Sequence, residues 1–153
     1  MKTMKSLRFV LAASSVLLQT TWAANWPHWR GPHYNGSTDE THLPATWSTT
    51  ENVAWKTGLP GPSGSSPVIW GDYVFVSTPD ASKNLNLICL NRKDGSVRWQ
   101  KQVASGDRNA GPRSNMTSPS PVTDGKVVVA MYGTGDVAGY DFEGKELWER
   151  NLG

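Results

Sequence analysis

The sequence predicts an all-β protein, a partial β-propeller of four-stranded antiparallel blades with two full blades plus one N-terminal closing strand. Two observations support this fold class. A Ser-Pro-Val segment followed by an apolar hairpin occurs twice, beginning at Ser66 and Ser120, 54 residues apart. Each copy ends in a glycine turn and a strand with a tryptophan, Trp99 or Trp148, 49 residues apart. Repeats of this length are typical of radially arranged sheets.

The first 23 residues have the pattern of a secretory signal peptide. A basic start with Lys2, Lys5 and Arg8 precedes a short apolar run, and small residues lead to an expected cleavage near Ala23. The apolar run is about half of the roughly 20 residues that a membrane span requires, which favours cleavage over a retained anchor. We therefore expect a periplasmic or secreted protein without a transmembrane span after cleavage.

The charge balance argues against nucleic acid as a partner. The chain has 15 Lys and Arg against 13 Asp and Glu, and loss of the three basic residues in the signal leaves 12 against 13, a net charge near −1. No dense basic run is left in the mature part. Cys89 is the single cysteine, so no internal disulfide is expected, and its apolar neighbours predict a buried, inert thiol.

Residues 24–52 show no strand pattern and predict an irregular N-terminal strap packed over the propeller. Two Trp, two His, Arg30 and Tyr34 gather between Pro and Gly within residues 26–37. Capping an opening, holding a polar ligand, or binding carbohydrate through Trp29 are alternative functions of this segment. His28 and His33 do not by themselves predict a metal site, because no third ligand follows at a useful spacing.

Residues 53–59 predict an outer strand that lacks the other strands of its blade. Its valine, tryptophan and leucine repeat the spacing found around Trp99. In a closed propeller such a strand completes the last blade, so we expect the remaining blades beyond Gly153. A two-blade protein that assembles with copies of itself is the alternative.

Residues 65–104 predict the first blade, and residues 119–153 predict the second. In each blade a two-residue turn, Gly71-Asp72 or Asp124-Gly125, separates two apolar runs, which is a strong hairpin signal. The inner runs are apolar at nearly every position, and this indicates burial on both faces. The fourth strand alternates with polar residues and is expected at the outer edge.

Residues 105–118 form the inter-blade loop, which must cross one face of the propeller. Arg108, Arg113 and Asn115 offer donors suited to carboxylates, phosphates or an ortho-quinone. This loop is therefore the candidate binding site for a protein or small-molecule ligand. A solvated loop whose Ser and Thr side chains cap turns is the alternative.

The recurring tryptophans suggest either ligand binding or packing between blades. A binding site seldom needs the same residue in every blade, so we interpret Trp55, Trp99 and Trp148 as wedges between neighbouring blades. The other positions that repeat are Gly95, Gly144 and Asp141.

The segments LNRKDGSVRW and YDFEGKELW resemble the repeat of pyrroloquinoline-quinone-like (PQQ-like) propellers, in which Asp-x-x-x-Gly-x-x-x-Trp ends each blade. Asn91 stands where that pattern usually has Asp, and the second copy, from Asp141, is one residue shorter. Together with WPHWRGP and SSPVIWGDYVFV, the stretch from Asn25 to Gly153 is similar to exported bacterial PQQ-like proteins related to the outer-membrane assembly lipoprotein BamB.

The resemblance implies a non-catalytic binding or scaffold module. The alternative is the N-terminal part of a PQQ- and calcium-dependent quinoprotein alcohol or sugar dehydrogenase, because the family contains both kinds of protein. Such catalysis requires calcium held by carboxylate and amide oxygens and a general-base carboxylate. Asp80, Asp107 and Asp136 are isolated turn residues by their context, so no catalytic, metal-binding or cofactor-binding residue is predicted within this chain.

Overall fold

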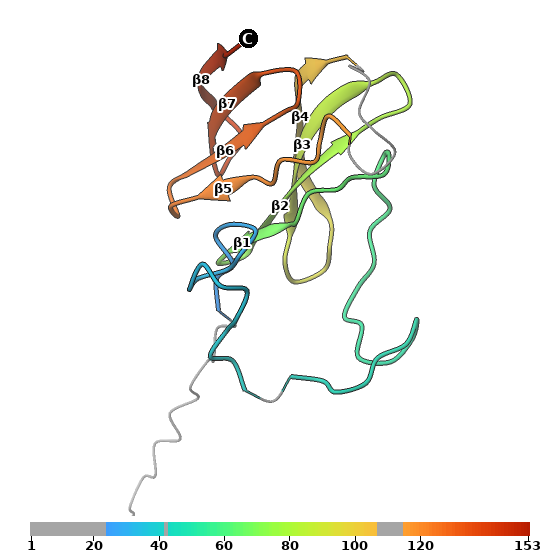
Figure 1. The fold of residues 1–153 in the computed structure, drawn as a ribbon. Helices are drawn as coiled ribbons and strands as arrows, with labels where there is room; N and C mark the ends of the chain where they lie inside the picture. Colours follow the sequence, from blue (N-terminus) through green and yellow to red (C-terminus); the bar gives the residue numbers. More distant parts are fainter. Residues whose placement is uncertain (1–23, 42, 107–114) are drawn as a thin grey trace, which may run out of the picture.

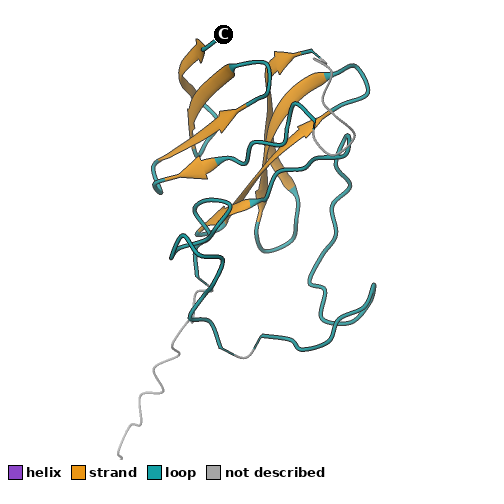
Figure 2. Ribbon diagram, viewed as in Figure 1, coloured by secondary structure: helices purple, strands orange, loops and turns teal. Residues whose placement is uncertain are grey.

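The computed structural model describes residues 24–41, 43–106 and 115–153. The expected signal peptide, residues 1–23, lies outside the described residues. The described residues form two four-stranded antiparallel sheets, in the orders β1-β2-β3-β4 and β5-β6-β7-β8 (Figures 1 and 2). This confirms the all-β class and the four-stranded repeat. No helix in this part of the chain is long and apolar enough to cross a membrane.

The first sheet consists of β1 (Val68–Trp70), β2 (Tyr73–Pro79), β3 (Asn84–Asn91) and β4 (Val97–Ser105). Trp70 pairs with Tyr73 across the Gly71-Asp72 turn, as the sequence predicts. The φ angle of Gly71 is 54°, a left-handed conformation that suits glycine in such a tight turn.

The second sheet consists of β5 (Val122–Thr123), β6 (Val127–Met131), β7 (Asp136–Asp141) and β8 (Glu146–Asn151). Thr123 pairs with Val128, so the connection between β5 and β6 is longer than the predicted two-residue turn. The carboxylate of Asp124 explains the longer form, because its Oδ1 accepts hydrogen bonds from the backbone N–H groups of Lys126 and Val127, each at 2.9 Å.

The two sheets lie side by side and share one hydrophobic core (Figure 1). Phe75 and Cys89 of the first sheet are fully buried, as are Val128 and Ala130 of the second. Burial on both faces holds for β2 and β3 but not for β6, in which Met131 is 44% exposed. The reason is that β6 has the first sheet on one side only, while β2 and β3 also pack against Trp55.

Each of two tryptophans contacts the turn between the third and fourth strands of the following sheet. The Nε1–H of Trp99 donates to the carbonyl of Phe142 at 2.8 Å, and its ring lies against Gly144. Trp55 donates in the same way to the carbonyl of Arg92 at 2.7 Å, and its ring lies against Gly95. This one contact, repeated, joins neighbouring units, and it leaves no room for a side chain at either glycine.

No strand pairing joins residues 53–59 to another described residue, so the predicted outer strand of a closing blade stays a prediction. A β-strand is defined by hydrogen bonds to a neighbouring strand, and this segment reaches the first sheet through side chains instead. Besides Trp55, the hydroxyl of Thr57 donates to the carbonyl of Gly95 at 2.6 Å. The segment thus holds Trp55 in the position of a fourth-strand tryptophan.

Candidate functional site

Of the three predicted binding residues, the structure describes Asn115; Arg108 and Arg113 lie outside the described residues. Asn115 uses both ends of its amide within the protein. Its Nδ2 donates to the carbonyl of Pro62 at 3.0 Å, while its Oδ1 accepts from the backbone N–H and the hydroxyl of Thr117 at 3.0 and 2.7 Å. Asn115 therefore fixes the end of the inter-blade loop onto the segment that precedes β1.

A cavity of about 200 Å³ lies beside Asn115. Asp80, Lys83 and Asn115 contribute its polar lining, and Leu85 and Met116 contribute apolar atoms. The side chain of Asn84 donates to the carboxylate of Asp80 at 2.9 Å, and this hydrogen bond holds the pKa of Asp80 below its ordinary value. The lining of this cavity is mainly apolar, with Asp80, Lys83 and Asn115 as its polar residues.

Hydroxyl groups that the sequence analysis did not single out connect the two blades next to this cavity. The hydroxyl oxygens of Thr117 and Ser63 lie 3.2 Å apart, and Ser66 N–H donates to the hydroxyl of Ser120 at 2.9 Å. Both pairs are 54 residues apart, which is the spacing of the repeat itself. The repeat spacing marks the members of each pair as equivalent positions, but only the folded chain shows that they meet.

The strap crosses the inner strands of both sheets. Trp26 exchanges two backbone hydrogen bonds of 2.8 Å with Ile69 of β1, and the next carbonyl, that of Pro27, accepts from Thr123 N–H of β5 at 2.9 Å. Figure 1 shows the strap at the ends of β1 and β5. Among the described residues, neither His28 nor His33 belongs to a group of three potential metal ligands: the His28 ring lies tilted against Tyr34 with centroids 4.0 Å apart, and His33 contacts Asp39 alone at 3.0 Å.

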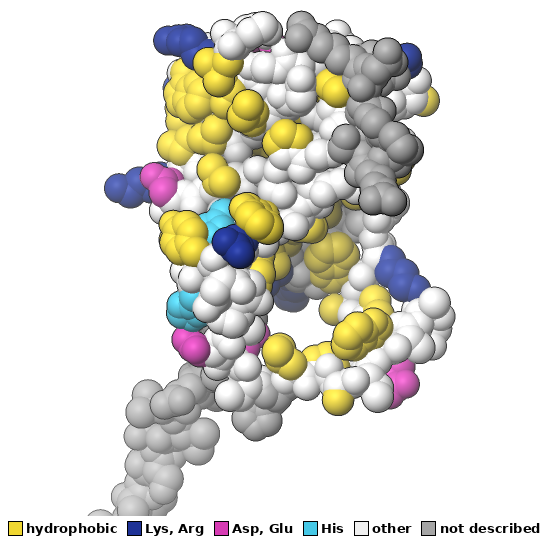
Figure 3. Space-filling view, in the orientation of Figure 1, with side chains coloured by type: hydrophobic (Ala, Val, Ile, Leu, Met, Phe, Trp, Pro, Cys, Tyr) yellow, Lys and Arg dark blue, Asp and Glu magenta, His cyan; other side chains and the backbone are white. Residues whose placement is uncertain are grey.

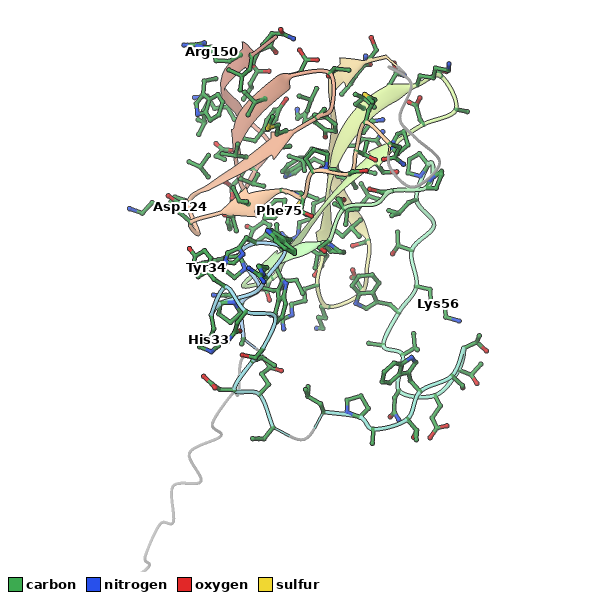
Figure 4. All side chains as sticks on the ribbon, in the orientation of Figure 1. His33, Tyr34, Lys56, Phe75, Asp124 and Arg150 are labelled. Carbon is green, nitrogen blue, oxygen red and sulfur yellow. The ribbon has the colours of Figure 1, made fainter. Side chains whose placement is uncertain are left out.

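A second cavity, of about 620 Å³, lies between the strap and the second sheet. Pro27, His28 and Tyr34 form its strap side, and the hairpin of β5 and β6 forms the facing side. Figure 4 shows Tyr34 on the strap near the turn that carries Asp124. The lining is mainly apolar, so this cavity suits an apolar surface rather than an ion.

The carboxylates of the described residues stabilise turns rather than form a cluster. Asp94 accepts from the backbone N–H and the hydroxyl of Ser96, which lowers its pKa, and Asp141 accepts from Lys145 N–H at 2.8 Å. Across the described ranges, no three His, Cys, Asp or Glu side chains gather to hold a metal ion. The described residues by themselves therefore provide no calcium site of the kind that a quinoprotein dehydrogenase needs.

Comparison with known proteins supports the repeat architecture. The family model described as outer membrane protein assembly factor BamB matches residues 20–153. BamB from Moraxella catarrhalis has a TM-score of 0.48 and 20% identity, covering 65% of this chain and 27% of that chain. A europium-containing methanol dehydrogenase has a TM-score of 0.54 and 16% identity, covering 84% of this chain and 23% of that chain.

The chain thus spans 27% and 23% of the lengths of these two solved structures. At 16% identity, the likeness to the dehydrogenase shows a common fold and nothing about activity. None of the curated proteins matches the chain.

Proposed function

The chain belongs to the PQQ-like β-propeller family whose model is described as outer membrane protein assembly factor BamB. On this premise we propose that the chain is part of an exported propeller that binds a partner without catalysing a reaction. The family match over residues 20–153 is the observation that carries the proposal. The family is described as an assembly factor, so a protein is the partner that we favour.

The binding surface in this proposal is the face of the propeller that carries the inter-blade loop. Asn115 ties the end of that loop to Pro62, and the hydroxyl pairs beside it connect the two blades. Arg108 and Arg113 belong to the same loop in the sequence, and the proposal assigns the partner contact to them. Two guanidinium groups suit acidic side chains on a protein partner, because arginine forms paired hydrogen bonds with carboxylates.

A binding assay with charge-matched variants tests this proposal. The intact protein and an Arg108→Ala/Arg113→Ala double variant are used to capture proteins from a cell-envelope extract. A Lys126→Ala/Arg150→Ala variant removes the same charge from exposed positions of the second sheet and serves as the control. We expect one partner to be retained by the wild type and the control and lost from the loop variant. Equal retention by all three would refute a role for the loop.

A dehydrogenase assay tests the non-catalytic part of the proposal. The intact protein is supplied with PQQ and calcium and tested for dye-linked oxidation of alcohols and sugars. We expect no turnover above the cofactor alone. Turnover that depends on both PQQ and calcium would establish the quinoprotein dehydrogenase alternative instead.

A further inference from the structure

The strap connects the inner strands of the two blades through its first residues. Trp26 exchanges two backbone hydrogen bonds with Ile69 of β1, whereas the second blade is reached by one, from Thr123 N–H of β5 to the carbonyl of Pro27. Among the described residues, no other backbone hydrogen bond joins the strap to the second blade. The connection to the second blade is therefore the weaker of the two.

His28 follows Pro27 directly and closes the turn that comes next. Its carbonyl accepts from Gly31 N–H at 2.8 Å, and its ring Nδ1 accepts from Arg30 N–H at 3.2 Å. This turn lies on the docked part of the strap, because a Cβ at Gly31 would be 2.6 Å from the ring of Trp26. A change in the turn therefore reaches the residues that bind β1 and β5.

The hydrogen bonds of His28 suit the neutral form of its ring. An Nδ1 that accepts a hydrogen bond carries no proton, so the proton of the neutral ring is on Nε2. Protonation would turn Nδ1 from an acceptor into a donor that faces the N–H of Arg30. The side chain is 8% exposed, and its Nε2 has no hydrogen-bond partner among the described residues. Neither N–H of the charged ring would then have an acceptor, which disfavours the charge.

The strap itself offers little to offset this cost. The ring of Tyr34 lies tilted against that of His28, with centroids 4.0 Å apart, and an aromatic face attracts a cation. Tyr34 is 71% exposed, however, so water weakens that attraction. Arg30 adds a second positive charge nearby, and its guanidinium lies over the ring of Trp29, 5.0 Å from the centroid. Figure 3 shows histidine, basic and hydrophobic side chains close together on the strap.

The two sheets do not supply a partner for a charged His28 either. Trp70 of β1 carries no charge, and Asp124 is the carboxylate in the lining of the cavity that His28 shares with both sheets. No ion pair joins His28 to a carboxylate among the described residues. Hydrogen bonds from the backbone N–H groups of Val127 and Lys126 lower the pKa of Asp124. Its charge is therefore constant in the range where imidazoles titrate, and it causes no pH dependence there.

We propose that the strap is a pH-sensitive connection between the blades, and that protonation of His28 releases it from the second blade. A free imidazole takes up its proton near about pH 6.5. The released strap binds this proton better than the docked strap, so docking is strongest above that pH and weakens as the pH falls. Where only the neutral form docks, one pH unit below about 6.5 lowers the docking equilibrium about tenfold. The inference goes beyond the proposed binding function and does not depend on the inter-blade loop.

Hydrogen exchange of Thr123 N–H at different pH values tests this proposal. Exchange rates in the intact protein are measured by NMR and divided by the intrinsic rates at each pH, which gives protection factors. We expect the protection factor of Thr123 to fall about tenfold from about pH 7.5 to about pH 5.5. Tyr132 N–H donates to the carbonyl of Asp136 within the second sheet at 2.9 Å, and its protection should not change. A protection factor of Thr123 that does not depend on pH would overturn the proposal.

Two matched variants assign the effect to one histidine. His28→Asn keeps a side-chain oxygen that can accept from Arg30 N–H, but it has no group that titrates in this range. His33→Asn removes a second histidine of the strap, which is more exposed and contacts Asp39 at 3.0 Å. We expect the first variant to lose the pH dependence and the second to keep it. PH dependence that persists in His28→Asn, or that disappears in His33→Asn, would contradict the role of His28.

The ring signals of His28 provide a measurement that needs no variant. We expect the Hε1 signal of His28 and the amide signal of Thr123 to shift over the same pH range, because one event moves both. A ring that titrates while the Thr123 amide stays unchanged would refute the proposal. A ring that does not titrate between about pH 5.5 and about pH 7.5 would also refute it. Neither outcome depends on the partner-binding assay.

Discussion

The Nε1–H of Trp99 donates a hydrogen bond to the carbonyl oxygen of Phe142 at 2.8 Å, which links the outer strand of the first blade to the last turn of the second. The same bond recurs between Trp55 and Arg92 at 2.7 Å. A tryptophan side chain thus serves as the standard connection between neighbouring units. Its ring provides apolar area, and its N–H fixes the relative position of the two sheets.

Substitution of Trp99 separates these two contributions. We expect Trp99→Ala to lower the free energy of unfolding by about 3–5 kcal/mol through loss of packing. Trp99→Phe keeps an aromatic ring but leaves the carbonyl of Phe142 unpaired, and we expect a loss of about 1–3 kcal/mol. Urea denaturation measures both values. Two variants as stable as the wild type would show that the contact does not join the blades.

Gly144 should tolerate no side chain, for two reasons. Its φ angle is +84°, and a Cβ there would lie 2.9 Å from Trp99 Cδ2. Gly36 has a φ of +83° with nothing near its Cβ position, so Gly36→Ala is a control for backbone strain alone. We expect the control to cost about 1 kcal/mol and Gly144→Ala to cost clearly more in thermal or urea unfolding. Equal losses of stability in Gly36→Ala and Gly144→Ala would mean that the ring of Trp99 moves aside without a loss of packing energy.

Alkaline pH should destabilise the fold through Cys89. Burial raises the pKa of its thiol from 9.0 to about 12, because the thiolate is poorly solvated in the core. The unfolded chain therefore loses this proton first, and stability falls as pH rises from about 9 towards 12. Melting temperatures from about pH 8 to about pH 10, roughly the window below tyrosine ionisation, measure the effect.

Cys89→Ala provides the matched comparison for this pH effect. The variant should be less stable at pH 7 because it leaves a small cavity, yet its melting temperature should fall less steeply above pH 9. Burial also raises the pKa of Tyr132, but the tyrosine effect begins at higher pH. Identical slopes for variant and wild type would show that the thiol does not titrate with unfolding.

Asn115 should matter for stability as well as for the loop. Asn115→Asp keeps the acceptor for Thr117 and loses the donor to Pro62, whereas Asn115→Ala loses both. We expect a loss of about 1 kcal/mol for the aspartate and a larger loss for the alanine. Calorimetry of both variants checks the order. An alanine variant as stable as the wild type would contradict the role of Asn115 as an anchor.

The blades could be predicted because their signals are local and occur twice. The Gly71-Asp72 turn and the apolar runs beside it specify a hairpin without reference to the rest of the chain. The longer β5–β6 connection was missed because the carboxylate of Asp124 closes it, and a side-chain hydrogen bond leaves no mark on the apolar pattern.

The segment around Trp55 shows what the spacing of apolar residues can and cannot predict. The spacing identified Trp55 as equivalent to Trp99, whereas the predicted outer strand needs a neighbouring strand that the described residues do not include, so that part stays a prediction. The hydrogen bond from Asn115 to Pro62 could not be predicted from the sequence either. Its partner Pro62 is 53 residues away, and only the folded chain brings the two together.

Hydrogen exchange of the indole N–H groups, followed by NMR, tests most directly the claim that a repeated tryptophan contact joins the units. In the 153-residue chain, we expect the Nε1–H groups of Trp55 and Trp99 to be protected by their carbonyl partners. Trp47, which is 72% exposed, should exchange at the rate of a free indole. Exchange of Trp99 as fast as that of Trp47 would contradict the account.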